Sequence, residues 1–208
     1  MNDIKIIKTE ILSKEWSLLK RVTFEYLQKD GSWQTQKREI YERGNASVIL
    51  LYNKKQNTII LTKQFRLASF LNGNKTGMLI EACAGMIDEN ESPENATIRE
   101  AKEETGYKVR NTTKVFESYM SPGSLTEILY FFIAEYSHDL KIDEGGGIAH
   151  EQENIEVIEI DFNNALKMID TQLKSAQSDA VKKFLTDTRV IEADHLEQAK
   201  KIQQSMTS

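Results

Sequence analysis

The chain has 208 residues, of which 39% are hydrophobic and 28% are charged, and its formal net charge is −5. This composition is typical of a globular protein with one sizeable core, and the acidic balance argues against a nucleic-acid-binding protein, which needs a basic surface. The longest apolar run, residues 128–134, is too short to span a membrane. The first residues lack the apolar core of a signal peptide. We therefore expect a cytoplasmic protein without nucleic-acid or membrane partners.

Residues 1–44 are expected to form a small antiparallel β unit. A first strand is expected at residues 4–7. Val22, Phe24 and Tyr26 alternate with polar residues, as in a half-buried strand. Residues 29–32 have the composition of a hairpin turn, and a returning strand follows over residues 33–41. A unit this short cannot easily bury a core of its own, so we expect it to pack on something larger.

The remaining chain is expected to alternate strands with a few helices, which predicts an α+β fold. Strands are expected at residues 47–52, 58–62, 78–84, 114–119, 128–136 and 155–160. Residues 71–77 are expected to form a loop, and helices are expected at residues 163–170 and 178–185. Cys83 is the only cysteine, and its apolar surroundings predict a buried structural thiol. We divide the chain into residues 1–44, a main domain of residues 45–190 and a tail of residues 191–208.

The strongest local signal is a helix between Ser92 and Gly106. Serine is a good N-cap, Pro93 suits the first helical position, and glycine suits the position just past the C-terminus. A narrow stripe that can face a core has the spacing i, i+3, i+7. Its members are Ile98, Ala101 and Thr105.

The other face of this helix carries an unusual group of carboxylates. Glu100, Glu103 and Glu104 have the spacing i, i+3, i+4, so their side chains project together near the C-terminus, where the helix dipole disfavours negative charge. Arg99 offsets only part of the repulsion. A divalent cation would resolve it, and an all-oxygen site suits Mg²⁺ or Mn²⁺. The alternative is a solvated acidic helix face.

The spacing of residues 85–107 resembles the signature of the Nudix superfamily: Gly, five residues, Glu, seven residues, Arg-Glu, two residues, Glu-Glu, one residue, Gly. Further stretches resemble the bacterial GDP-mannose hydrolases of the ADP-ribose pyrophosphatase branch; they are residues 37–44, 61–66, 80–85, 119–123, 145–147 and 155–157. The resemblance implies a Nudix α/β/α sandwich with a mixed sheet. It also implies Mg²⁺, with Mn²⁺ as an alternative, and a homodimer that exchanges its N-terminal β units.

The resemblance also assigns metal and catalytic roles by position. The metal ligands are the carbonyl of Ala84 and the carboxylates of Glu100, Glu104 and Glu153. Glu103 supports the site, Arg99 orients the carboxylates and Glu91 shapes the loop before the helix. Glu151 is the candidate general base, because related enzymes place one on this loop. The alternative for Glu151 is a solvated loop carboxylate.

Substrate contacts are implied in the same way. Trp16 would stack on the nucleobase, although a lone tryptophan is more often a core residue. Arg66 would pair with the diphosphate, which suits a planar guanidinium. Gln177 stands where the family has a lysine, so a cation near the sugar or phosphate end is missing. The full set is Trp16, Lys37, Arg38, Glu39, Arg66, Ala84, Gly85, Met86, Glu104, Glu127, Gln152, Glu153 and Gln177, with residues 37–39 contributed by the exchanged β unit.

The expected reaction is hydrolysis of the diphosphate bond of a nucleoside diphosphate sugar, GDP-mannose to GMP and mannose 1-phosphate. One alternative is an ADP-ribose pyrophosphatase that releases AMP and ribose 5-phosphate. Another is a Nudix-fold sensor that binds nucleotide sugars without turnover. A sensor would have a broken carboxylate set, whereas the set here is complete.

Overall fold

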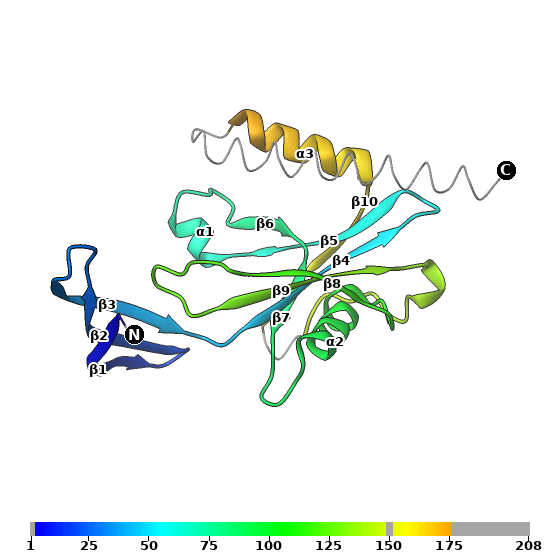
Figure 1. Cartoon of the computed structure of the whole chain (residues 1–208). Coiled ribbons are helices and arrows are strands. Elements are labelled where there is room, and N and C mark those ends of the chain that lie inside the picture. Colours follow the sequence, from blue (N-terminus) through cyan, green and yellow to red (C-terminus); the bar gives the residue numbers. More distant parts are fainter. Residues whose placement is uncertain (1–2, 149–151, 176–208) are drawn as a thin grey trace. The chain divides into compact units, whose positions relative to one another are not determined.

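The computed structural model describes residues 3–148 and 152–175 (Figure 1). The chain divides into two compact units, one made of Met1–Asn53 with Ile60–Ile158 and the other of Lys54–Ile59 with the chain from Glu159 onward. Among the described residues, no helix has the length and apolar character needed to cross a membrane.

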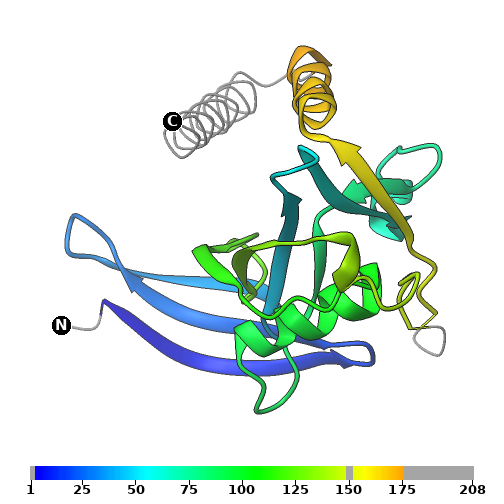
Figure 2. The same cartoon turned by 90° about the vertical axis from the view of Figure 1, so that its right-hand side faces the viewer.

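The N-terminal residues form a three-stranded antiparallel sheet, as expected. Its strands are β1 (Ile4–Lys14), β2 (Leu18–Leu27) and β3 (Trp33–Glu42), in the order β1-β2-β3. In Figure 2 these strands lie side by side at the blue end of the chain. The β2–β3 turn forms where predicted: the carboxylate of Asp30 accepts the backbone N–H of Ser32 at 2.9 Å, and Gly31 has a φ of 84°. β1 is longer than expected, because pairing with β2 extends it to Lys14.

The second sheet is mixed, as the sequence predicts. Its strands are β4 (Ala46–Asn53), β5 (Thr58–Phe65), β6 (Met78–Glu81), β7 (Cys83–Met86), β8 (Thr113–Tyr119), β9 (Ile128–Glu135) and β10 (Glu156–Asp161). The order is β10-β5-β4-β9-β8, with β6 paired to β5 and β7 to β4. β4 and β9 are parallel, whereas β7 runs antiparallel to β4. The single strand expected at residues 78–84 is therefore two strands, because the chain changes neighbour at Ala82.

The helices are α1 (Leu67–Leu71), α2 (Pro93–Thr105), the short 3₁₀ helix η1 (His138–Leu140) and α3 (Phe162–Ser175). Sequence patterns did not predict α1, which has five residues and no side-chain cap. α3 lies where the helix over residues 163–170 was expected, and the carboxylate of Asp161 accepts the N–H of Asn163 at 2.9 Å. The helix expected at residues 178–185 lies outside the described residues.

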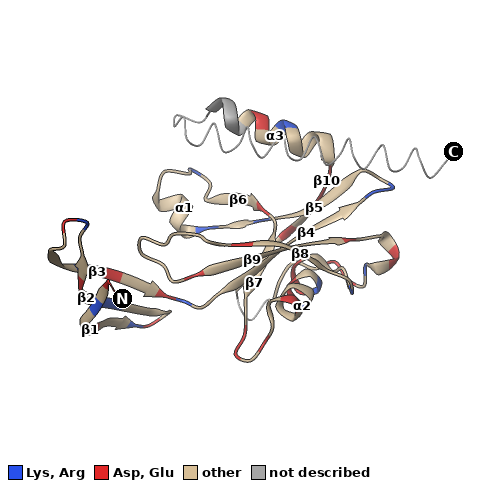
Figure 3. Cartoon of the chain, viewed as in Figure 1, with Lys and Arg blue, Asp and Glu red and all other residues tan. Residues whose placement is uncertain are grey.

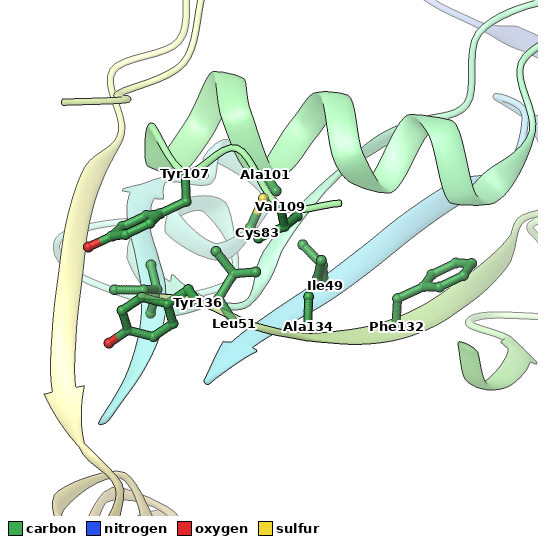
Figure 4. Close-up of a cluster of buried hydrophobic side chains, with 10 residues drawn as sticks. Ile49, Leu51, Cys83, Ala101, Tyr107, Val109, Phe132, Ala134 and Tyr136 are labelled. Atoms are coloured by element: carbon green, nitrogen blue, oxygen red, sulfur yellow. The ribbon is translucent and has the colours of Figure 1, made fainter. Parts of the chain in front are cut away.

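The main core lies between α2 and the sheet, where α2 packs on β7, β4 and β9. Cys83 is 1% exposed, which confirms a buried thiol. The rings of Tyr107 and Tyr136 meet edge to face, 4.9 Å apart (Figure 4). The cluster comprises Ile49, Leu51, Ile60, Cys83, Ala101, Tyr107, Val109, Phe132, Ala134 and Tyr136.

The sequence predicted that the carboxylates of α2 lie on the face opposite the one that packs against the sheet. This prediction is wrong for two of them. Glu100 and Glu104 are buried together with Ala101, whereas Ile98 is only half-buried. The reason is geometric: residues four apart share a face, so Glu100 and Glu104 flank Ala101 on the side that packs against the sheet. Two acidic groups are therefore held inside the protein.

Candidate active site

Local sequence signals fix both ends of α2. The hydroxyl of Ser92 accepts the N–H of Asn95 at 3.2 Å, and Pro93 is the first helical residue. Gly106 ends the helix in the left-handed conformation, with a φ of 76°. These three predictions are confirmed, and they place the carboxylates in the last two turns of α2.

A glycine-rich loop caps the C-terminus of α2. Gly146 donates its N–H to the carbonyl of Glu104 at 2.8 Å, and Gly147 donates to the carbonyl of Glu103 at 3.0 Å. All three glycines of residues 145–147 have positive φ. These donors satisfy carbonyls that the helix leaves unpaired and offset part of the negative end of its dipole. The loop thereby eases the burial of negative charge at this end of the helix.

Glu100 occupies space that only glycine leaves open in β7. The residue is 8% exposed. A Cβ atom added at Gly85 would lie 1.9 Å from the Cδ and Oε1 atoms of Glu100. Ser47 is opposite Gly85 in the β4–β7 pair, and its buried hydroxyl has no hydrogen-bond partner among the described residues. The glycine of the signature is thus a steric requirement for the carboxylate.

Glu104 is still more deeply buried, at 2% exposed. Its Oε2 accepts the N–H of Ala84 at 3.2 Å. Burial raises the pKa of Glu104 to about 7, against the lowering effect of the Cys83 thiol and of this N–H. Burial likewise raises the pKa of Glu100 to about 7, although Arg99 opposes the shift. Ionising either carboxylate therefore costs free energy, because burial removes it from water.

Arg99 joins the helix to the loop that precedes it. Its guanidinium donates to both carboxylate oxygens of Glu91, at 3.1 and 2.9 Å, and to the carbonyl of Met86 at 2.9 Å. It also donates to Glu100 at 2.7 Å and to Glu103 at 3.1 Å. The pKa of Arg99 is raised, first by Glu91, and Arg99 lowers the pKa of Glu91. Figure 3 shows acidic residues in red on α2 and on this loop.

Glu153 approaches the same end of α2 through the glycine loop. Its Oε2 accepts the N–H of Ile148 at 2.8 Å, and a Cβ atom at Gly147 would lie 2.5 Å from that oxygen. Gln152 is exposed and has a φ of 62°. Glu151 and Gln177, two of the candidate site residues, lie outside the described residues.

The donor set fits a divalent cation by its chemistry. Carboxylate and carbonyl oxygens are the ligands that hard cations prefer. Within residues 3–148 and 152–175, no three His, Cys, Asp or Glu side chains already stand close enough to hold a metal ion. In this arrangement Glu100 accepts a hydrogen bond from Arg99 at 2.7 Å, and Glu104 accepts one from the backbone N–H of Ala84 at 3.2 Å.

The predicted substrate residues occupy several elements. Trp16 lies in the β1–β2 turn and is 90% exposed, so the alternative of a core tryptophan is wrong for this chain. Arg66 pairs with Glu81 at 2.9 Å. Lys37, Arg38 and Glu39 lie on β3, in the N-terminal sheet.

Glu127 precedes β9 and is 7% exposed. It lies 3.5 Å from the guanidinium of Arg43. The same guanidinium donates to the sulfur of Met86 at 3.3 Å, so the structure connects these two candidate residues. The sequence analysis did not identify Arg43 or Asn45 as site residues. Both lie between β3 and β4, where no periodic pattern of side chains marks a position.

Comparisons with known proteins identify the domains of this chain and its fold. Residues 3–41 match the family model described as the GDP-mannose pyrophosphatase NudK N-terminal domain, and residues 42–176 match the NUDIX domain. GDP-mannose pyrophosphatases of Escherichia coli O9:H4 and Shigella boydii serotype 4 are each 50% identical over 168 residues, which is 81% of this chain and 86% of theirs. The crystal structure of an ADP compounds hydrolase superposes with a TM-score of 0.61 at 18% identity, over 82% of this chain and 84% of that chain, and so shares the fold.

Nudix hydrolases generally need a divalent metal ion, which agrees with the buried carboxylates on α2. The chain belongs to the Nudix family, with the N-terminal domain of the GDP-mannose pyrophosphatases joined to the NUDIX domain.

Proposed function

We propose that this chain hydrolyses the diphosphate bond of a nucleoside diphosphate sugar, converting GDP-mannose to GMP and mannose 1-phosphate with Mg²⁺. The observation that carries the proposal is the buried pair Glu100 and Glu104, held beneath a glycine of the Nudix signature. A protein that only binds nucleotide sugars would have no use for two buried carboxylates, which cost free energy to ionise. The relatives at 50% identity support the choice of GDP-mannose.

The metal would be held by Glu100, Glu104, Glu153 and the carbonyl of Ala84. When bound, Mg²⁺ neutralises charge on the diphosphate oxygens and activates a water molecule. Arg99 positions the carboxylates, because it bonds to Glu100 and to Glu103 at the same time. Glu103 supports this arrangement. Glu151 removes a proton from the attacking water in this proposal.

Substrate binding is assigned to a second group of residues. Trp16 stacks on the nucleobase, for which its 90% exposure leaves a free face. Arg66 leaves Glu81 to pair with the diphosphate, where a guanidinium binds two oxygens at once. The other residues of the group are Lys37, Arg38, Glu39, Gly85, Met86, Glu127, Gln152 and Gln177.

The N-terminal sheet supports a homodimer in which the two chains exchange their N-terminal β units. Large apolar side chains on β1 are exposed, as an interface requires. They are Ile4, Ile6, Ile7, Ile11 and Leu12. The same proposal divides the chain into residues 1–44, 45–190 and 191–208. It also places the protein in the cytoplasm. The net charge of −5 supports the proposal that the protein does not bind nucleic acid.

A substrate panel tests the reaction. Release of nucleoside monophosphate would be measured with Mg²⁺ for GDP-mannose, GDP-glucose, ADP-ribose and ADP-glucose. We expect the highest kcat/KM for GDP-mannose. A large preference for ADP-ribose would instead establish the alternative pyrophosphatase, and no turnover of any of the four would favour the sensor.

A further inference from the structure

Residues 41–45, called the linking segment here, run from the last two residues of β3 to the start of β4 and bind two loops, the one that follows β7 and the one that precedes β9. At its start, Tyr41 donates its N–H to the carbonyl of Ser124 at 2.7 Å and accepts the N–H of Thr126 at 3.3 Å. These bonds continue β3 as a short parallel bridge to Leu125. The loop that leads to Glu127 is therefore fixed to the end of β3.

At the end of the linking segment, Asn45 holds both loops at once. Its carbonyl accepts the N–H of Ile87, directly after β7, at 3.0 Å. Its side-chain oxygen accepts the N–H of Ile128, directly after Glu127, at 3.0 Å. One residue thereby sets the separation between the signature loop and the start of β9.

Between these anchors, Arg43 connects the two candidate substrate residues. Its Nε lies 3.5 Å from Oε1 of Glu127, and its Nη2 donates to the sulfur of Met86 at 3.3 Å. The side chain of Glu127 is 9% exposed, against 41% for Arg43. Exposed ion pairs contribute little to the stability of the folded state, whereas a buried carboxylate that loses its positively charged partner destabilises it strongly. Gly44 supports the contact, since a Cβ there would lie 3.1 Å from the Cε of Met86.

We propose that Arg43 is a positioning residue for substrate binding, which acts by holding Glu127 and Met86 in place. The inference rests on the proposed function, because Glu127 and Met86 are substrate residues only in that proposal. Arg43 itself need not touch the substrate. Most of its effect should therefore be lost when the carboxylate of Glu127 is already absent, because only the contact with the sulfur of Met86 then remains.

A double-mutant cycle tests this dependence. The variants are Arg43→Met, Arg43→Lys, Glu127→Gln and the double variant Arg43→Met with Glu127→Gln, each measured for kcat, KM and Tm. We expect Arg43→Met to raise KM about tenfold, as contacting residues of one network are strongly coupled. Arg43→Lys should restore part of the loss, because lysine keeps the charge. In the Glu127→Gln background, Arg43→Met should change KM less than about twofold.

Lys63→Met is the matched control. Lys63 forms an exposed ion pair with Glu156 at 2.8 Å, so its loss removes a pair outside the linking segment and should leave KM unchanged. The proposal is overturned if Arg43→Met raises KM by the same factor in the wild-type and Glu127→Gln backgrounds. It is also overturned if Arg43→Met lowers Tm and leaves KM unchanged. If the wild type turned over no substrate of the panel, the proposed function would be wrong. The role of Arg43 would then be decided by measuring the Kd for GDP of the same four variants.

Discussion

Single atoms decide whether the carboxylates of α2 fit against the sheet. Gly85 is required because the carboxylate of Glu100 occupies the position of its missing side chain. The glycine therefore acts through packing, in addition to any freedom it gives the backbone. Sequence comparison alone identifies the glycine of the signature, but only the structure names the group that needs the space.

Gly85→Ala should displace Glu100 and lower kcat by about 10–100-fold, the usual effect of disturbing the support of a metal ligand. The measurement is steady-state turnover of GDP-mannose, with circular dichroism to verify the fold. Gly123→Ala is the control, because a Cβ atom at Gly123 would meet nothing within 4 Å. Unchanged kcat in Gly85→Ala would show that Glu100 can move without consequence.

The buried carboxylates also predict how stability depends on pH. Burial raises the folded-state pKa of Glu100 and Glu104 from 4.5 to about 7, so the folded state binds more protons than the unfolded state between these values. Stability that these groups contribute is present below pH 4.5 and is lost as pH rises towards 7.

In EDTA, we therefore expect Tm to fall over this pH range, and Glu104→Gln should flatten the slope. Added Mg²⁺ should raise Tm more at pH 8 than at pH 5, since ionised carboxylates bind metal. The readout is differential scanning calorimetry. A Tm of the metal-free protein that rises steadily from pH 5 to pH 8 would contradict the raised pKa values.

At the scale of elements, α2 and the glycine loop form one functional unit. The N–H groups of Gly146 and Gly147 bind the carbonyls of the two glutamates at the end of the helix. The two glycines therefore act as a cap that fixes the helix end from which Glu104 projects.

Gly145→Ala tests the cap. Gly145 has a φ of 66°, and an added Cβ would lie 2.5 Å from the carbonyl oxygen of Glu104. We expect about 1–2 kcal/mol of backbone strain and about 1–3 kcal/mol from the clash. Gly31→Ala is the matched control, because Gly31 has a φ of 84° with nothing within 4 Å and so isolates the strain. Equal losses of Tm in the two variants would exclude a tight contact between the loop and α2.

The sequence predicted the elements whose signals are local. Ser92, Pro93 and Gly106 act on neighbouring backbone groups, so the limits of α2 were accurate. The division of β6 from β7 depends on which strand each one pairs with, and no local pattern records that choice. The burial of Glu100 and Glu104 was missed for a similar reason, because it follows from packing against β7. Arg43 acts through contacts with residues more than 40 positions away.

At the scale of the whole molecule, the N-terminal sheet presents apolar residues without a partner in the described chain. Ile6 and Ile11 are 62% and 63% exposed. A three-stranded sheet has little core of its own, so burying these side chains in an interface would stabilise it. This is the physical basis for expecting a dimer.

Light scattering after size exclusion should give twice the chain mass of 23.9 kDa. Ile11→Glu should shift the protein towards monomer, because the interface would then bury an unpaired charge. Gln34→Glu, an exposed position of β3 in the same sheet, should leave the mass unchanged. A wild-type protein that is monomeric at micromolar concentration would refute the exchange of β units.

The most direct test of the account compares wild type with Glu104→Gln on GDP-mannose, in MgCl₂ and in EDTA, with both products identified by phosphorus NMR. We predict GMP and mannose 1-phosphate from the wild type in MgCl₂ alone, and no products from Glu104→Gln although it folds. Equal turnover by the variant, or wild-type turnover that persists in EDTA, would contradict a metal-dependent hydrolase built on the carboxylates of α2.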